Sequence, residues 1–292
     1  MTEKVVALGN FDGMHLGHIA VLDKALEAAK DGFSPYVLLF SQHSEKALFG
    51  SAPPMLMTHS ERRAFIEAYG FGIAEIDFNR IKDMSPEEFI DKILIGEMNA
   101  KAVVSGYNYR FGKNASGDTD TLRQLCAKRG ITCHTVSEVE QDGTAVSSTA
   151  IRRLIENGEI ERANRMLARS FGFSAEVIHG DERGREWGFP TVNQLLPEGF
   201  VIPKFGVYAS SVTVDGRTYR GITNIGRRPT VGTEILLSET HIIDFSEDVY
   251  GKEADIRLLS FMRPEHKFSS FDELKNQIKN DIANLKGSDG SV

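Results

Sequence analysis

The sequence predicts an α/β domain with a parallel sheet, followed by a smaller antiparallel β-barrel domain with a terminal helix. The first observation is the length of 292 residues, which is long for one ordinary domain and comfortable for two. The second is an alternation of short apolar runs with amphipathic segments in the first half, which indicates a parallel sheet covered by helices. The third is a change of period after about Arg169, where apolar stretches flank the hairpin signal Asp215-Gly216. We place the domain boundary at residue 168, which gives domains 1–168 and 169–292.

Each element of the first domain has a local signal. Short apolar runs predict strands buried on both faces at residues 5–8, 36–40, 102–104 and 131–136. Apolar residues at helical spacing predict a helix over residues 19–29, and Gly32 follows it as a stop signal. Capping boxes predict two further helix starts, at Thr58 with Glu61 and at Ser85 with Glu88.

The second domain shows a β-rich pattern after a helical connection over residues 148–169. Two strands at 207–214 and 218–223 form the predicted hairpin, and further β-rich pieces lie at 241–245 and 256–261. Ser270 and Glu273 cap a final helix whose apolar residues are Phe271, Leu274, Ile278, Ile282 and Leu285. Strands followed by one helix predict a small barrel with a terminal helix.

Composition excludes several classes of protein. The 41 acidic and 34 basic residues give a formal charge of −7, which argues against a nucleic-acid groove but allows a local phosphate site. Cys126 and Cys133 are the only cysteines, so we expect neither a disulfide framework nor a zinc site, and reduced thiols fit the cytoplasm. The start of the chain resembles no signal peptide and no later run could span a membrane, so we expect a soluble cytoplasmic protein.

Residues 9–18, Gly-Asn-Phe-Asp-Gly-Met-His-Leu-Gly-His, follow the first predicted strand and open the first helix. At this position an α/β sheet presents backbone N–H groups and a positive helix end to an anion. His15 and His18 lie three residues apart and can donate to phosphate oxygens as charge builds in a transition state. The alternative is that one histidine caps the helix and the other packs.

This segment resembles the signature of His-x-Gly-His nucleotidyltransferases, and its form is similar to the flavin adenylyltransferase branch. The resemblance implies a Rossmann-like nucleotidyltransferase domain, with His15 and His18 catalytic and with ATP contacts from Gly9, Phe11, Asp12 and Gly17. A second segment, Ser-Ser-Thr-Ala-Ile-Arg at 147–152, resembles the family segment in which hydroxyls and a guanidinium hold ATP, here Ser148, Thr149 and Arg152. Ser148 could instead be an ordinary helix cap. A third segment at 106–112 resembles one that brings Asn108 into the active site, although its aromatic residues could simply pack.

Two stretches of the second half, 180–185 and 188–193, form a glycine-rich loop with short oxygen side chains. Such a loop can wrap phosphates and offer a hydroxyl and an amide oxygen to Mg²⁺. The run Gly-Phe-Pro-Thr-Val-Asn at 188–193 resembles the riboflavin kinase signature, with valine in place of alanine and Trp187 in place of leucine nearby. The resemblance implies Mg²⁺ binding by Thr191 and Asn193, and ATP contacts from those two residues and from Gly180, Gly184 and Arg185.

Later segments resemble the kinase in the same order, and Glu239 matches the catalytic glutamate of that family. A carboxylate suits the task because the 5′-hydroxyl of riboflavin must lose a proton as it attacks the γ-phosphate. Without the motif, Glu239 reads as a solvent-facing strand residue. Alternation along a strand places Glu239 and His241 on one face and Thr240 on the other. We interpret His241 as packing or supporting rather than catalytic.

The resemblance covers residues 5 to about 285 and is to the bifunctional prokaryotic riboflavin kinase/FMN adenylyltransferases. It implies ATP and riboflavin giving FMN in the second domain, then ATP and FMN giving FAD and pyrophosphate in the first, both with Mg²⁺. Gln42 and Ser44 stand where that family has prolines beside the flavin. One alternative is therefore a kinase with an impaired or re-targeted adenylyltransferase domain. Another is a flavin-binding or nucleotide-binding regulator without catalysis.

Overall fold

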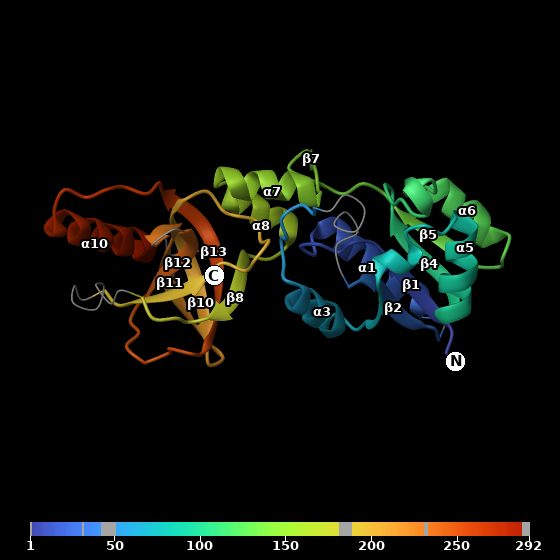
Figure 1. Cartoon of the computed structure of the whole chain (residues 1–292), viewed down its shortest axis with the longest axis horizontal. Coiled ribbons are helices and arrows are strands. Elements are labelled where there is room, and N and C mark those ends of the chain that lie inside the picture. The colour runs from blue at the N-terminus through green and yellow to red at the C-terminus, as the bar shows by residue number, and fades with distance from the viewer. Residues whose placement is uncertain (1, 31, 42–50, 181–188, 231–232, 288–292) are drawn as a thin grey trace. The chain divides into compact units, whose positions relative to one another are not determined.

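The computed structural model describes residues 2–30, 32–41, 51–180, 189–230 and 233–287. The chain divides into two compact units, Met1–Ala150 and Ile151–Val292 (Figure 1). Helices α7 (Ser148–Asn157) and α8 (Ile160–Leu167) confirm the helical connection predicted for residues 148–169. The sequence pattern places the domain boundary at residue 168, whereas the compact units divide after Ala150. The difference arises because α8 packs on strands of the second unit. Within the described ranges, no helix is both long and apolar enough to traverse a bilayer.

A parallel sheet forms the centre of the first unit. Its five strands lie in the order β3-β2-β1-β4-β5, and their bounds are Lys4–Leu8 for β1, Ser34–Phe40 for β2, Gly72–Ile76 for β3, Ala100–Gly106 for β4 and Thr132–Val136 for β5. All four predicted strands are present, but β5 is not buried on both faces as predicted, because it lies at the edge of the sheet and its residues are half-buried or exposed. β3 has no counterpart among them, because the glutamate in its sequence Gly-Ile-Ala-Glu-Ile interrupts the apolar run.

Helices cover both faces of this sheet. They are α1 (Leu16–Ala29), α3 (His59–Ala68), α4 (Phe78–Ile81), α5 (Pro86–Glu88), the π-helix η1 (Phe89–Glu97), the 3₁₀ turn η2 (Lys113–Ala115) and α6 (Thr119–Ala127). One core cluster joins α1 and α3 to one face, and a second joins η1 and α6 to the other. Both predicted capping boxes are present, at the starts of α3 and α5. A short hairpin, β6 (Glu140–Gln141) with β7 (Thr144–Ala145), precedes α7.

The strand order determines where this sheet can hold a ligand. β1 pairs in parallel with β2 on one side and with β4 on the other. The chain therefore leaves β1 and β4 toward opposite faces, and their carboxyl ends form the switch point at which parallel sheets generally bind ligands. Leu8 of β1 lies opposite Ser105 of β4, so the loops that follow these two residues share one edge of the sheet.

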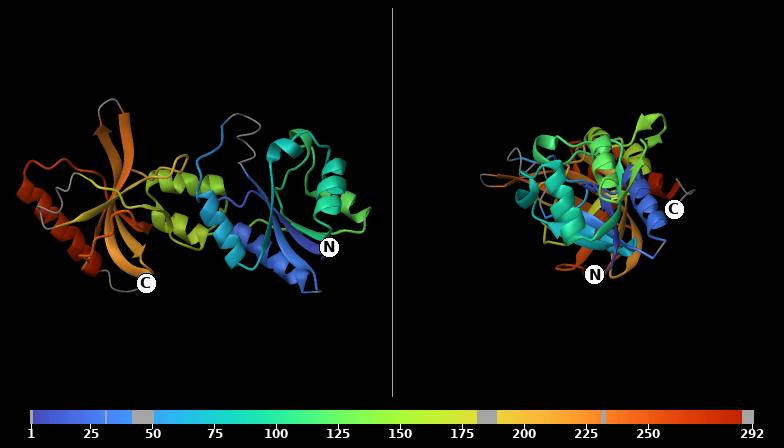
Figure 2. Two further views of the ribbon diagram at one scale, coloured as in Figure 1. Left: turned by 60° about the horizontal axis from the view of Figure 1, so that its bottom comes forward. Right: turned by 90° about the vertical axis from the view of Figure 1, so that its right-hand side faces the viewer.

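An antiparallel sheet forms the second unit. Its six strands lie in the order β8-β13-β10-β11-β12-β9, with bounds Phe171–Glu176 for β8, Thr191–Leu195 for β9, Gly206–Val214 for β10, Arg217–Thr230 for β11, Thr233–Ile242 for β12 and Glu253–Arg263 for β13. The sheet curls (Figure 2), and Ile178, just beyond β8, forms a bridge with Asn193 of β9.

Local sequence explains the hairpin of this unit and one error. Asp215 and Gly216 turn between β10 and β11 with φ of 49° and 73°, which confirms the predicted two-residue turn. The predicted strand at 241–245 is only partly correct, because β12 ends at Ile242. Asp244 has φ of 57°, a left-handed conformation that a continuing strand excludes.

The two faces of the curled sheet differ in chemistry. On the inner face the buried hydroxyl of Thr223 contacts those of Ser210 and Thr240 at 2.8 Å each. The outer face carries Glu239 and His241, which confirms the predicted alternation along β12. Helix α10 (Phe271–Gly287) packs Ile282 and Leu285 against this outer face, and Figure 2 shows the helix beside the sheet. The hydroxyl of Ser270 accepts the N–H of Glu273, as the predicted cap requires.

Candidate active sites

The loop between β1 and α1 has a tightly constrained backbone. Phe11, Gly13 and Met14 have φ of 52°, 83° and 47°, and the side chains of Phe11 and Met14 are fully buried. The carboxylate of Asp12 is buried and accepts the backbone N–H of Leu56 at 3.0 Å. Asp12 therefore holds the loop in place through its side chain.

His15 and His18 lie together at the start of α1. His15 is the N-cap, and its Nδ1 accepts the N–H of His18 at 3.3 Å. The two imidazoles stack with centroids 3.7 Å apart. Gly17 leaves room for this stack, since a Cβ there would lie 3.2 Å from the His15 ring. His15 therefore caps the helix through Nδ1, as the alternative interpretation expects. The two rings also lie close enough to contact the same phosphate group.

Burial favours the neutral form of His18. Burial lowers its pKa well below the usual histidine value, and the nearby His15 and Arg62 lower the pKa further. Arg62, on α3, donates to the carbonyl oxygen of Asn10 at 3.0 Å. Arg62 is absent from the predicted site residues, because only the folding of α3 brings it to this loop. A neutral imidazole still offers one N–H donor to a phosphate oxygen.

The second ATP segment contacts the first. Ser147 caps α7, since its hydroxyl accepts the N–H of Ala150 at 3.2 Å. Ser148 instead donates its hydroxyl to the carbonyl oxygen of Asp12 at 3.0 Å, so the N-cap interpretation of Ser148 is wrong. Thr149 is its neighbour at the start of the helix, and Arg152 follows one turn later and is buried. The structure thereby brings two of the motifs into contact through Ser148 and Asp12.

Asn108 lies in the turn after β4, at the sheet edge that the loop after β1 shares. Its side chain is exposed, as a ligand contact requires. The aromatic residues beside it do pack: the rings of Tyr109 and Phe111 stack with centroids 5.9 Å apart. Burial also raises the pKa of the Tyr109 hydroxyl. Asn108 therefore remains the candidate for ligand contact in this segment.

A row of side chains crosses the sheet of the second unit. Asn193 on β9 pairs with Glu239 on β12, which pairs with Asn224 on β11. Asn224 pairs with Val207 on β10, and Val207 with Arg263 on β13. Residues directly opposite each other on antiparallel strands point to the same face. All five line a cavity of about 930 Å³, and we call them the cross-strand row.

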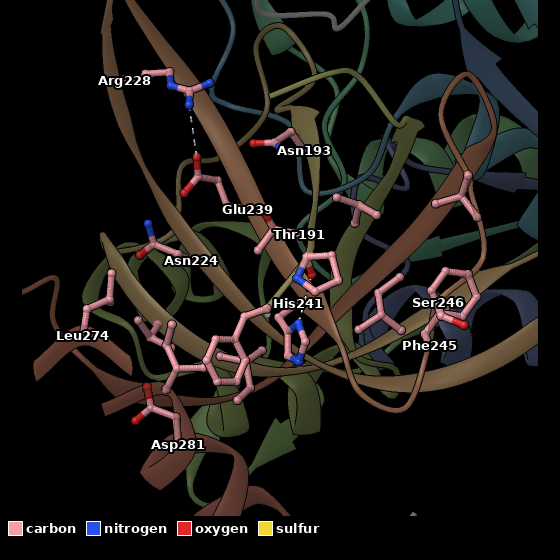
Figure 3. Close-up of a pocket in the computed structure, with 18 of the residues that line it drawn as sticks. Thr191, Asn193, Asn224, Arg228, Glu239, His241, Phe245, Ser246, Leu274 and Asp281 are labelled. Carbon is pink, nitrogen blue, oxygen red and sulfur yellow. Dashed lines mark hydrogen bonds and ion pairs between the residues drawn. The ribbon is translucent and has the colours of Figure 1, made fainter. Parts of the chain in front are cut away.

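Glu239 faces a cation within this cavity. Its Oε1 lies 3.8 Å from Nη2 of Arg228 on β11, and Figure 3 shows the two side chains directed at each other. The Nδ1 of His241 lies 2.9 Å from the carbonyl oxygen of Pro190, and its ring meets Phe189 edge to face. His241 therefore anchors the chain just before β9, in keeping with a supporting role. Arg228 lies in one of the segments that resemble the riboflavin kinase. Only the pairing of β11 with β12 brings it close to Glu239.

Asn193 fits a hard cation. Its side chain is 5% exposed, and among the described residues its buried Oδ1 has no hydrogen-bond partner. Gly180 packs against this amide, since a Cβ there would lie 2.4 Å from Nδ2. Thr191, two residues earlier on β9, lines the same cavity. An unused amide oxygen beside a hydroxyl suits Mg²⁺, whereas the described part of the chain holds no cluster of three or more His, Cys, Asp or Glu side chains for a metal.

The rest of the cavity is apolar on the side of α10. Val207, Ile222, Leu274 and Ile278 line it together with the buried Asp281, and Figure 3 shows Leu274 and Asp281 extending from that helix. The sequence pattern identifies the apolar stripe of α10 but gives no sign that it walls a cavity. Gly184, Arg185, Gln42 and Ser44 lie outside the described residues.

Family models of known proteins match both units. The model described as FAD synthetase matches residues 1–150, and the model described as riboflavin kinase matches residues 167–288. Curated relatives carry the name bifunctional riboflavin kinase/FMN adenylyltransferase. That of Listeria monocytogenes is 36% identical, with 95% of this chain and 90% of the relative covered. That of Escherichia coli strain K12 is 32% identical, with 95% and 90% covered. The chain belongs to this family.

The bifunctional enzyme is also similar to a solved structure. That structure, named a macrolide-efflux protein from Streptococcus pneumoniae, is 30% identical, with 99% of this chain and 95% of that chain covered and a TM-score of 0.91. The relative from Bacillus subtilis is 35% identical, with 96% of this chain and 90% of the relative covered. The two family models assign flavin cofactor synthesis to the enzyme, with a riboflavin kinase and an FMN adenylyltransferase activity.

Proposed function

We propose that the enzyme performs its two reactions at two separate sites, one in each proposed domain. The adenylyltransferase site is the loop after β1 with the start of α7 and Asn108, in a Rossmann-like nucleotidyltransferase domain. The kinase site is the cavity on the outer face of the second sheet, whose bridge between Ile178 and Asn193 supports a small closed barrel. The proposed domains remain 1–168 and 169–292, and the proposed location is the cytoplasm.

At the first site, a phosphate oxygen of FMN attacks the α-phosphorus of ATP, FAD forms and pyrophosphate leaves. The N–H groups at the start of α1 and the donor nitrogens of His15 and His18 hydrogen-bond to the phosphate oxygens as charge develops. Ser148, Thr149 and Arg152 bind the rest of the triphosphate. The lowered pKa of His18 supports a hydrogen-bonding role rather than that of a fixed cation.

At the second site, Glu239 accepts the proton of the riboflavin 5′-hydroxyl as that oxygen attacks the γ-phosphorus of ATP, and ADP leaves. Mg²⁺, held by Oγ1 of Thr191, Oδ1 of Asn193 and the phosphates, would neutralise charge on the transferred group. Arg228 lies 3.8 Å from Glu239 and is placed to offset charge on the same phosphoryl group. The match of residues 167–288 to the riboflavin kinase model supports this arrangement.

The acceptor lies along the cross-strand row. The ribityl chain must reach Glu239 with its 5′-hydroxyl, so the flat ring system extends toward Val207. The apolar surface of Leu274 and Ile278 on α10 lines the cavity there and suits an uncharged aromatic ring. The observation that carries the proposal is the row itself, which aligns a cation ligand, a base and an apolar wall on one face.

The test is incubation of the purified enzyme with riboflavin, ATP and Mg²⁺, followed by chromatographic separation of riboflavin, FMN and FAD. Appearance of FMN and then FAD supports both sites. FMN alone would point to the first alternative, a kinase whose adenylyltransferase site is impaired or serves another acceptor. Riboflavin and ATP left unchanged would point to the second alternative, a regulator that binds without catalysis.

A further inference from the structure

Helix α10 buries a charge in the face that it turns to the sheet. Its apolar residues on that face follow helical spacing, and they are Leu274, Ile278, Ile282 and Leu285. Asp281 lies in the same stripe and is only 3% exposed. A carboxylate removed from water is costly unless charged or polar partners compensate it. The stripe therefore contains one position where the helix depends on a specific partner.

Arg263, at the end of β13, is that partner. Its Nε donates to Oδ1 and Oδ2 of Asp281 at 3.3 and 3.1 Å, and its Nη2 donates to Oδ2 at 2.8 Å. Nε2 of Gln277 donates to Oδ1 at 2.8 Å. The guanidinium also lies 5.8 Å from the centre of the Phe268 ring. Such a two-nitrogen contact fixes direction as well as distance.

Arg263 also ends the cross-strand row. It pairs with Val207 on β10, and β10 lies two strands away from β12, which carries Glu239. Both Arg263 and Asp281 line the proposed kinase cavity. The ion pair therefore ties α10 to the strand row that carries the reacting groups. The proposed phosphoryl transfer assigns no contact with ATP, Mg²⁺ or the reacting hydroxyl to Arg263 or Asp281. The mechanism therefore leaves this pair without a role.

We propose that the Arg263–Asp281 pair sets the register of α10 on the sheet and thereby positions the apolar wall that holds the flavin. An apolar stripe alone is weakly selective, because a slide by one turn, about 5.4 Å, exchanges one apolar contact for another. A directional ion pair selects one register, as single buried polar groups do in helical bundles. Arg263 and Asp281 are thus positioning residues for the acceptor. This inference rests on the proposed function of the kinase site.

The test compares Asp281→Asn and Arg263→Lys with the wild-type enzyme. Asparagine keeps the shape but removes the charge, and lysine keeps the charge but removes the two-nitrogen contact. We expect the KM for riboflavin to rise roughly tenfold in Asp281→Asn, with kcat and the KM for ATP within about threefold of wild type. Arg263→Lys should show a smaller rise. Quenching of flavin fluorescence on riboflavin binding should give the same ranking without turnover.

The matched control is Asp255→Asn, which removes the carboxylate from another ion pair on β13. Asp255 accepts Nε of Arg257 at 2.9 Å and does not line the cavity, so its KM for riboflavin should stay at the wild-type value. Equal riboflavin KM in wild type and both test variants would overturn the inference, as would an equal rise in Asp255→Asn. If the wild-type enzyme itself neither bound nor phosphorylated riboflavin, the proposed kinase site would be wrong instead.

Discussion

Asn193 and Glu239 lie directly opposite each other on adjacent antiparallel strands. This pairing puts an amide oxygen without a partner among the described residues and a carboxylate on the same face, where both side chains line one cavity. The two residues should nevertheless affect different constants. In the proposed mechanism Asn193 would act on bound Mg·ATP, whereas Glu239 would act only while the proton moves.

Substitution should separate these roles in the kinase reaction. Thr191→Ala or Asn193→Ala should abolish most phosphorylation, because loss of an oxygen ligand disturbs Mg·ATP. Glu239→Gln should leave ATP affinity nearly unchanged and lower kcat by roughly 10²- to 10⁴-fold, as expected for a general base. Calorimetric titration of ATP, beside steady-state rates, makes the comparison. A large loss of ATP affinity in Glu239→Gln would remove its assignment as the base.

Gly180→Ala should impair the kinase without unfolding the protein. The new methyl group would lie 2.4 Å from Nδ2 of Asn193, so the amide must turn away from its present position. We expect a raised KM for Mg·ATP in FMN formation, with FAD formation from supplied FMN unchanged. Half-reaction assays on one preparation test this. Wild-type KM for Mg·ATP in Gly180→Ala would show that the placement of the Asn193 amide is not critical.

Changes at the first site should spare the second. His15→Ala or His18→Ala should depress FAD formation by roughly 10²- to 10³-fold, the usual effect of losing a transition-state donor. FMN formation should survive, since the kinase cavity lies wholly within the second unit. Separate assays of the two reactions decide the point, with circular dichroism to confirm folding. Loss of both activities in a folded histidine variant would contradict the assignment of two sites.

His18 should make stability depend on pH. Its pKa is lowered in the folded state by burial, then by His15 and Arg62. Below the pKa of the unfolded state, the unfolded chain therefore binds more protons at this residue than the folded chain does. The free energy of unfolding should therefore fall as pH drops below about 6.5, by at most about 1.4 kcal/mol per pH unit from this residue. His18→Gln should reduce that slope. Urea unfolding of both proteins on either side of about pH 6.5 measures it, and identical slopes would refute the effect.

Local signals made much of the fold predictable. The Asp215-Gly216 turn and the capping boxes at Thr58 and Ser85 depend on a few neighbouring residues, and all three are present. The end of β12 depends instead on the left-handed backbone at Asp244, which no apolar pattern reveals. The attachment of α8 to the second unit likewise follows from tertiary packing.

The candidate sites divide in the same way. His15, His18, Asn193 and Glu239 lie in contiguous motifs, so the sequence alone could nominate them. Arg62 and Arg263 reach their sites through a distant helix or through strand pairing, and isolated arginines give no such sign. Arg228 lies in a segment that resembles the kinase, but only the folded sheet brings it to Glu239. The weakening of FMN binding by Gln42 and Ser44 stays a prediction from the sequence. The double change Gln42→Pro with Ser44→Pro should lower the KM for FMN more than it changes kcat.

The alternation along β12 also limits which insertions and deletions the chain can tolerate. Inserting one residue just before Glu239 would shift the strand by one position and exchange its two faces. Glu239 would then enter the inner face in place of Thr240, beside the buried hydroxyls of Ser210 and Thr223. An unpaired carboxylate there opposes folding. A variant with such a register shift would therefore misfold, and its catalytic rate could not be compared with that of the wild type.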